Sequence, residues 1–370
     1  MAESDTSEES MRGEAQPEAP TDISGESGPR TTRRQLLRTM GMAGAGTAAG
    51  LALTQWLAAC GDATARHVSV PVTPTPTATA QPQPTATPDT RPVTLAITGD
   101  IMLARSVNTT LLSSHDRFPF NDTADYLRGF DLTIGNLECV VSSLGVPQPK
   151  EFTFEANPVA FGRLPLAGYD IVSVANNHSG DYGKAAFMDM LGHLTQFGIT
   201  PLGGGANLAE AHRPVIRRIR TTTIGILAYC EIDPLDFAAT ASTPGHAWLD
   251  PTLMRADIQA LRPQVDFLIV FTHWGIEYQP QETTHQQYLA RLAIDAGADV
   301  VVGAHPHIIQ PYELYKGKLI VYSLGNFVFD EMYGEEALGN VLALTVQGSR
   351  LVSWRLRELR IGVYGQPAWV

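Results

Sequence analysis

Short apolar segments rich in β-branched residues recur from residue 93 onward and predict strands. The segments are Val93–Thr98, Leu132–Gly135, Ile171–Ala175, Ile224–Tyr229, Phe267–Thr272, Val300–Gly303, Leu319–Ser323, Val341–Val346 and Leu351–Leu356. Several are apolar at every position, which is typical of strands covered on both faces. The last segment continues to Val363 without turn residues and predicts a final strand or hairpin.

Helix-like segments lie between these strands. Lys184–Phe197 ends before Gly198, and Thr283–Ala296 starts with a threonine N-cap and ends before Gly297. Thr252–Leu261 is a third. Alternation of strands and helices indicates an α/β architecture with sheet packed between helices, and no second linker interrupts residues 93–370, which we interpret as one domain.

Composition excludes several classes of protein. The chain has 370 residues, 44% of them hydrophobic, and a formal net charge of −12. An acidic chain without a surplus of Lys and Arg binds the phosphate backbone of nucleic acids poorly, so we expect no nucleic-acid partner. Residues 1–30 contain eight acids, two arginines and almost no large apolar residues, and we expect a disordered acidic tail. The sequence leaves open whether translation starts at Met1 or Met11.

We interpret residues 31–60 as an export signal. Arg33 and Arg34 stand in a segment that resembles a twin-arginine signal, and an uncharged stretch follows up to Leu57-Ala58-Ala59-Cys60, which resembles a lipobox. This resemblance implies cleavage before Cys60, lipidation of its sulfur, and anchoring on the outer side of the cytoplasmic membrane, at the cell surface or in the periplasm. An uncleaved transmembrane anchor is the alternative, although three glycines and small residues favour a signal.

Residues 61–92 form a Pro/Thr-rich linker. Pro and Thr alternate there without an apolar face, which predicts an extended and semi-rigid spacer. A spacer of this kind would hold a folded domain away from the membrane surface.

Polar side chains follow six of the predicted strands. They are Asp100, Asn136 with Glu138, Asn177 with His178 and Asp181, His273, His305 with His307, and Asn326. In α/β sheets ligand sites form beyond the carboxyl ends of the strands. Carboxylates, amide oxygens and imidazoles suit a divalent transition metal, so we expect one or two ions, with Mn, Fe and Zn as candidates.

Other reactive side chains lack such a setting. We assign no role to His115, His193, His212, His246 and His285. Cys139 and Cys230 lie in apolar segments and are either buried thiols or one disulfide. Trp274 and Tyr278 either line the site or pack in the core.

These motifs together resemble the CapA family of capsule-biosynthesis proteins, named for poly-γ-glutamate capsule synthesis. The matching segments are Gly99-Asp100-Ile101-Met102, Gly135-Asn136-Leu137-Glu138, Ala175-Asn176-Asn177-His178 with Asp181, His273-Trp274-Gly275-Ile276-Glu277-Tyr278, Gly303-Ala304-His305-Pro306-His307 and Ser323-Leu324-Gly325-Asn326-Phe327. The family is similar to calcineurin-like metallophosphoesterases. The resemblance implies a four-layer αββα sandwich with a dinuclear metal site.

The resemblance also implies residue roles. Asp100 would be a carboxylate ligand and Glu138 a bridging one; Asn177, His273 and His305 would hold one metal, and His307 with Asp100 the other. His178 and Asp181 would resemble the catalytic general-acid pair. Asn136, Lys150 and Asn326 are predicted to contact substrate.

Two positions depart from the phosphoesterase pattern. Met102 stands where Asp-x-His has its histidine, and the second motif has Asn136 in place of the usual aspartate. These departures leave open how many metals bind and whether phosphate esters are substrates.

Three functions remain in competition at this point. The first is a surface-anchored, metal-dependent hydrolase or transferase in the synthesis or export of poly-γ-glutamate or a related polymer. The second is a metallophosphoesterase acting on a phosphate ester. The third is a non-catalytic scaffold of a capsule assembly complex. The expected partners are an anionic polymer or small anionic substrate, polymer synthase or export proteins, and the membrane through the lipid anchor.

The lipobox makes a prediction of its own. Replacing Cys60 by serine removes the sulfur that would carry the acyl chain, so Cys60→Ser should release or mislocalise the protein. The measurements are membrane fractionation and the intact mass of the mature protein. Unchanged mass and attachment in the variant would instead indicate an uncleaved anchor.

Overall fold

The computed structural model describes residues 89–370 except 115, 233 and 331. The predicted acidic tail, the export signal with Cys60, and most of the linker therefore lie outside the described residues. Within the described part of the chain, no helix is both long enough and apolar enough to cross a membrane.

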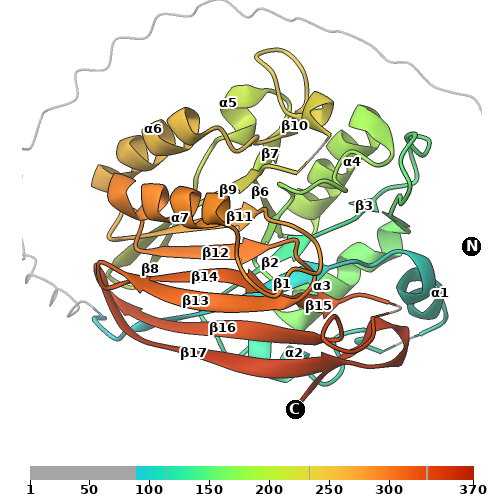
Figure 1. Cartoon of the computed structure of the whole chain (residues 1–370). Coiled ribbons are helices and arrows are strands. Elements are labelled where there is room, and N and C mark those ends of the chain that lie inside the picture. The colour runs from blue at the N-terminus through green and yellow to red at the C-terminus, as the bar shows by residue number, and fades with distance from the viewer. Residues whose placement is uncertain (1–88, 115, 233, 331) are drawn as a thin grey trace, which may run out of the picture. The chain divides into compact units, whose positions relative to one another are not determined.

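The first sheet is mixed. Its spatial order is β18 (Pro367–Trp369), β17 (Arg350–Ile361), β16 (Leu338–Gln347), β1 (Val93–Ile101), β2 (Leu132–Leu137), β5 (Ile171–Ser173) and β6 (Thr200–Leu202), with β15 (Asn326–Val328) pairing to β1 off this path. The strands from β1 to β6 are parallel, whereas β16, β17 and β18 pair antiparallel. The predicted terminal strand is therefore β17, paired along its length with β16 (Figure 1).

The second sheet has a parallel centre. Its order is β13 (Ile309–Tyr315), β14 (Lys318–Leu324), β12 (Val300–Ala304), β11 (Phe267–His273), β9 (Thr222–Cys230) and β8 (Val215–Ile219). Only the edge strands β13 and β8 pair antiparallel. Two short pairs complete the strands, namely β3 (Val140–Val141) with β4 (Glu155–Ala156) and β7 (Gly204–Gly205) with β10 (Gly245–His246).

Helices cover the outer face of each sheet. The first sheet packs against α1 (Arg105–Ser113), α2 (Ala124–Leu127), α3 (Arg163–Ala167) and α4 (Gly183–Gln196), and the second against α6 (Pro251–Leu261) and α7 (Thr284–Ala296). Figure 1 shows α6 and α7 side by side over the second sheet. The remaining helical segments are α5 (Leu208–Ala211) and the 3₁₀ turns η1 (Pro158–Gly162), η2 (Leu235–Phe237), η3 (Arg262–Gln264) and η4 (Val363–Gly365).

Three hydrophobic clusters lie between adjacent layers of the sandwich and hold them together. One joins the first sheet to its helices, one joins the second sheet to α6 and α7, and the middle one is formed by the facing sides of both sheets. The alternation along β9 is an example: Ile226 and Ala228 enter the middle cluster, whereas Leu227 and Tyr229 face the helices. The expected α/β/β/α sandwich is confirmed.

Local chemistry sets the helix ends close to where the sequence placed them. The Thr283 side chain accepts the amide N–H of Gln286, while the Gln286 side chain accepts the Thr283 N–H, a reciprocal capping box at the start of α7. Gly297 ends that helix with a positive φ of 127°. Asp250 caps α6, which begins one residue before the predicted Thr252 because Pro251 is well suited to the first helical position.

A carboxylate joins the two sheets at the ends remote from the strand-end motifs. Asp131 precedes β2 and accepts hydrogen bonds from the Thr94 amide and hydroxyl (2.9 and 3.0 Å) in β1. It also accepts two from Arg220 (2.8 and 2.6 Å) in the turn between β8 and β9. The hydrogen bond from Arg220 is the main cause that lowers the pKa of Asp131 from 3.8 to about 2.

This contact predicts a pH-dependent contribution to stability. We expect Asp131→Asn to lower the free energy of unfolding by about 1 kcal/mol at pH 7, as for charge-assisted hydrogen bonds at a partly exposed site. Because the folded pKa lies below the unfolded one, the contribution is complete above about pH 4–5 and is lost as the pH falls towards about 2. Urea unfolding at pH 7 and at low pH measures it. Asp125→Asn, at an exposed pair with Arg117, is the control and should change little. An Asp131→Asn effect independent of pH would contradict the assignment.

Candidate metal centre

The strand-end side chains of the two sheets come together at one edge of the sandwich. Asp100 lies near the end of β1, Glu138 follows β2, and His273 is the last residue of β11. His305 and His307 follow β12. All five side chains are buried, although each of them is polar or charged.

Donor atoms of these residues form two groups that share one carboxylate. Glu138, His305 and His307 form the first group, and Asp100, Glu138 and His273 the second; within each group the ligand atoms lie within 4.8 Å of one another. Glu138 thus occupies the position of a carboxylate between two centres. His305 also lies next to His273, with ring centroids 4.8 Å apart, so the implied sharing of one ion by His273 and His305 stays a prediction.

Neither carboxylate oxygen of fully buried Glu138 has a hydrogen-bond partner in the part of the chain that the structure describes. Its Oε1 lies 3.4 Å from His273 Nε2 and 3.9 Å from His307 Nε2. Burial, and then the nearby Asp100 carboxylate, raise the pKa of Glu138 well above its usual range. A buried carboxylate without a partner is costly unless a cation compensates it. The donor set therefore fits a divalent metal, as does the unpartnered Nδ1 of buried His305.

Asp100 differs from Glu138 because its neighbours favour the charged form. Burial raises its pKa, but a hydrogen bond from His307 and the charges of His273 and His307 outweigh it, so the pKa is lowered overall. Asn136 Nδ2 donates to Asp100 Oδ1 (2.8 Å), and the His305 amide donates to Oδ2 (3.2 Å). One of the two central carboxylates is thus ionised before any ion is bound.

The three imidazoles differ in how readily they lose a proton. Burial lowers the pKa of His273 to about 3, and burial followed by the charges of His273 and His307 lowers the pKa of His305 well below its usual value. Both rings are neutral at pH 7, which is the form that binds metals. At His307 burial also acts to lower the pKa, but Asp100 raises it overall, so a metal must displace a proton there.

The loop after β12 holds its histidines in a strained conformation. His305 has φ of 96° and His307 has φ of 58°, in the region that favours glycine. Strain of this kind persists only where the surroundings enforce it, and it concentrates at functional sites. At the base of the loop a Cβ on Gly303 would lie 2.0 Å from the Tyr322 carbonyl, so only glycine allows β12 to approach β14.

A second layer of asparagines orients the candidate ligands. Asn136 is fully buried; it donates to Asp100, lies 3.2 Å from His273 Nδ1, and accepts from Asn176 (3.0 Å). Asn326 Oδ1 lies 3.0 Å from His307 Nδ1, and its amide donates to the His307 carbonyl. Asn177 Oδ1 lies 2.9 Å from His273 Nε2 and so belongs to the centre itself. Substrate contact by Asn136 and Asn326 stays a prediction, because their observed bonds serve to hold ligands.

His178 and Asp181 form a hydrogen-bonded pair beside the centre. His178 Nδ1 lies 2.7 Å from Asp181 Oδ2, which also accepts the Phe154 amide (2.7 Å). Lys150 donates to Asp181 Oδ1 (2.7 Å) and to the Asn177 carbonyl (2.9 Å). The ammonium of Lys150 is therefore engaged with the pair as well as being partly exposed to solvent.

Two aromatic rings and one ion pair also surround the candidate metal centre. The sequence analysis identified none of these residues as part of the site. Phe154 stacks on His178 with ring centroids 4.1 Å apart, and Phe329 meets His307 edge-on at 5.0 Å. Arg105 lies over both phenyl rings and bonds buried Asp330. A polar residue after an apolar strand, as in Phe329-Asp330, is the signal that could have found this pair.

Met102 and Trp274 are core residues. Met102 is fully buried in the cluster between the first sheet and its helices, so the missing histidine of the first motif is replaced by packing. Trp274 is also fully buried, and its Nε1 donates to the Tyr322 carbonyl (2.9 Å). Tyr278 is half exposed, with its ring 6.1 Å from that of His307, and does line the site.

The remaining reactive groups lie outside the centre. Cys139 and Cys230 are both buried and free, so the thiol alternative is confirmed and the disulfide is wrong. Among the described histidines without an assigned role, His193 contacts Asp189, His212 contacts Asp257 and His285 contacts Glu231. His246 is buried against the rings of Phe237 and Trp248, and burial lowers its pKa to about 4.

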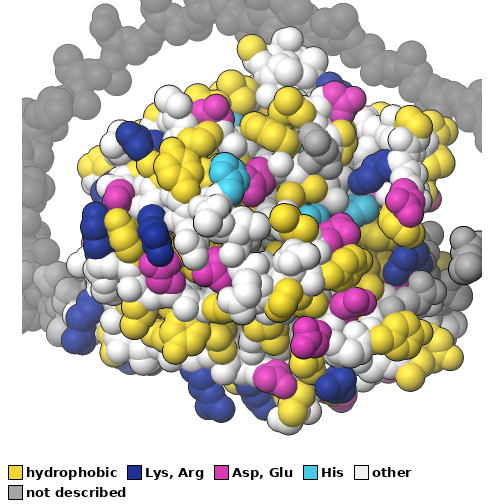
Figure 2. All heavy atoms as spheres, viewed as in Figure 1, with side chains coloured by type: hydrophobic (Ala, Val, Ile, Leu, Met, Phe, Trp, Pro, Cys, Tyr) yellow, Lys and Arg dark blue, Asp and Glu magenta, His cyan; other side chains and the backbone are white. Residues whose placement is uncertain are grey.

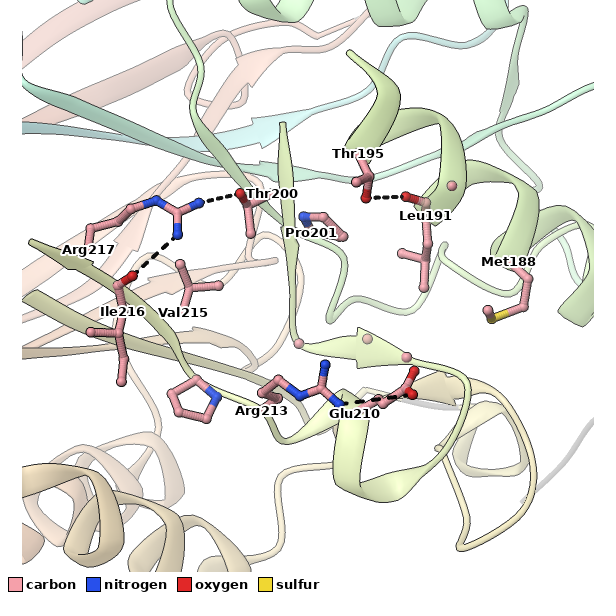
Figure 3. Close-up of a pocket in the computed structure, with 15 residues that line it drawn as sticks. Met188, Leu191, Thr195, Thr200, Pro201, Glu210, Arg213, Val215, Ile216 and Arg217 are labelled. Atoms are coloured by element: carbon pink, nitrogen blue, oxygen red, sulfur yellow. Dashed lines mark hydrogen bonds and ion pairs between the residues drawn. The ribbon is translucent and has the colours of Figure 1, made fainter. Parts of the chain in front are cut away.

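On the face shown in Figure 2, the described Lys and Arg side chains do not form one continuous basic patch. Figure 2 shows Lys and Arg side chains interspersed with Asp and Glu side chains over the face that it presents. A separate cavity of about 510 Å³ lies between α4 and the edge strands β6 and β8 (Figure 3). There Arg217 bonds Thr200 and Arg213 pairs with Glu210 at 4.0 Å, and none of the candidate ligands lines it.

Comparison with known proteins identifies relatives. A family model described as bacterial capsule synthesis protein PGA_cap matches residues 94–331. The chain is 34% identical over 236 residues to the PGA biosynthesis protein CapA of Bacillus subtilis, covering 63% of this chain and 62% of that protein. It is 28% identical over 274 residues to the capsule biosynthesis protein CapA of Bacillus anthracis, covering 72% and 64%. The chain thus spans slightly less than two thirds of each relative.

Among solved structures, a putative 5′-nucleotidase from Staphylococcus aureus in complex with α-ketoglutarate is similar, with a TM-score of 0.45 and 14% identity. The match covers 71% of this chain and 54% of that one. No residue role is transferred from it.

The geometry predicts which histidines are needed for metal binding. His305→Ala and His307→Ala should each lower the metal-to-protein ratio after dialysis. Loss of an outer-shell partner already costs about 10–100-fold in affinity, so loss of a direct ligand should cost at least as much. His193→Ala, which changes a partly exposed imidazole outside the centre, is the control. Elemental analysis of protein purified without chelator measures the ratio. Full occupancy in both variants would show that the ligands are misassigned.

Proposed function

The chain belongs to the bacterial capsule synthesis protein PGA_cap family, and from this membership we propose a metal-dependent hydrolase or transferase that acts on an amide-linked anionic polymer such as poly-γ-glutamate. One observation carries the catalytic part of the proposal. The buried Glu138 carboxylate accepts no hydrogen bond from the described residues and is shared by two groups of donor atoms. A polymer-binding scaffold without metal would gain nothing from such a costly arrangement.

Asp100, Glu138, His273, His305 and His307 would hold one or two divalent ions, with Asn177 as a further oxygen donor. Such ions supply a Lewis acid for a carbonyl oxygen and lower the pKa of bound water. The asparagines behind the ligands hold them in place before substrate arrives, as outer-shell partners do elsewhere.

His178 is the residue of this chain that moves a proton. Asp181, held by Lys150 and the Phe154 amide, accepts the Nδ1–H of His178 and leaves Nε2 for the reaction. Burial lowers the pKa of His178 despite Asp181, so the ring is neutral at pH 7. Nε2 therefore first accepts a proton from the attacking water or amine and then donates it to the leaving amine nitrogen as the amide C–N bond breaks.

We further propose that the protein works outside the cytoplasm, anchored by a lipid on Cys60 and held off the membrane by the linker, in association with polymer synthase or export proteins. Support for this comes from the twin-arginine and lipobox resemblances, together with the capsule-biosynthesis names of the relatives.

His178→Ala tests the catalytic proposal separately from metal binding. Loss of a positioned proton carrier should lower kcat by about 10²–10⁴-fold while the metal content stays unchanged. Hydrolysis of γ-linked polyglutamate and of a generic phosphodiester should be measured side by side with elemental analysis.

The outcomes separate the competing functions. Turnover of the phosphodiester alone would assign a phosphoesterase. Full metal occupancy with turnover of neither substrate would favour the scaffold. A His178→Ala variant with full turnover of polyglutamate would overturn the role given to this histidine.

A further inference from the structure

A cavity of about 420 Å³ lies next to the His178–Asp181 pair. Asp181 and Lys150 line one side of it, Lys184 and Asp236 contribute opposite charges, and Phe237 supplies an apolar surface. A Cβ on Gly180 would lie only 2.4 Å from the Phe237 ring, so the backbone at residue 180 is in direct contact with this surface. His178 does not itself line the cavity, but Asp181, which does, is hydrogen-bonded to it.

Two charges in this cavity have no partner among the described residues. Lys184 and Asp236 are both exposed, and neither has a hydrogen bond or an ion pair with another residue that the structure describes. In particular, they do not pair with each other across the cavity. Lys150 differs from them, because its ammonium contacts Asp181, the Asn177 carbonyl and, at 3.4 Å, His178 Nδ1. An unpaired cation and an unpaired anion on one cavity match a ligand that carries both charges.

We propose that this cavity binds the α-amino-carboxylate end of a terminal γ-glutamyl unit, with Lys184 on the α-carboxylate and Asp236 on the α-ammonium. This assignment rests on the proposed function. In a γ-linked chain the side-chain carboxyl forms the amide, so every unit keeps its α-carboxylate, but only the terminal unit also has a free ammonium. The ligand's methylenes would pack on Phe237, and its γ-amide would extend past Asp181 towards His178 and the metal ligands.

The proposal makes the protein selective for chain ends. Binding of γ-linked tetraglutamate to the full-length, Mn²⁺-loaded protein should be compared by calorimetry with two analogues. One is N-acetylated, which removes the ammonium, and the other has the α-carboxylate of its first unit converted to an amide. The unmodified tetramer should bind about 5- to 30-fold more tightly than either analogue, the scale expected for a charge-assisted contact.

Two substitutions should remove this selectivity one charge at a time. Lys184→Gln should equalise the tetramer and its amide but still discriminate against the acetylated form. Asp236→Asn should do the reverse. Lys316→Gln and Asp295→Asn alter an exposed Lys–Asp pair outside the cavity and should leave all three affinities unchanged.

Equal affinities for the three ligands in the unmodified protein, or no binding, would overturn the proposal. Tight binding of the acetylated tetramer that still depends on Lys184 would overturn the terminal-unit assignment, because an internal unit would then be the ligand. Glutamate release should be assayed in parallel. Selective binding without release would leave this subsite standing while contradicting the proposed hydrolysis.

Discussion

The buried Glu138 carboxylate is the constraint on which the rest of this site depends. A carboxylate that is fully buried and accepts no hydrogen bond destabilises a folded protein unless it is protonated or compensated by a cation. Here its neighbours are another carboxylate, Asp100, and the imidazoles of His273 and His307. The donor set around Glu138 is compatible with a divalent cation, which would compensate this carboxylate in its ionised form.

Support for this arrangement comes from the sandwich rather than from the loops alone. Parallel strands bring Asp100, Glu138 and His273 to one edge, and Asn136 bonds across from β2 to β1 and β11. The strained backbone at His305 and His307 is tolerated because Asp100 accepts the His305 amide and Asn326 bonds His307 on two atoms. A second layer of this kind holds the candidate ligands in position before an ion binds.

Asp181 links the proposed proton carrier to the proposed subsite. This carboxylate orients His178 through one oxygen and accepts a hydrogen bond from Lys150 through the other. Asp181 also lines the cavity that contains Lys184 and Asp236. A ligand that enters the cavity would thus lie against the residue that sets the tautomer of His178.

Nine of the strands, the ends of α6 and α7, and the strand-end motifs could be predicted from the sequence, because hydrophobic periodicity, capping residues and polar residues after strands are local signals. Strands such as β8 and β13 and the helices α1, α2 and α3 were not predicted. His305 and His307 could be identified together because they lie two residues apart in one loop. The position of Glu138 between two groups of donors, the holding roles of Asn136 and Asn326, and the burial of Met102 were decided only by the tertiary structure. The same is true of the cavity with Lys184 and Asp236. Each depends on distances between side chains from different strands or loops, and such distances are set by how the two sheets pack, not by spacing along the chain.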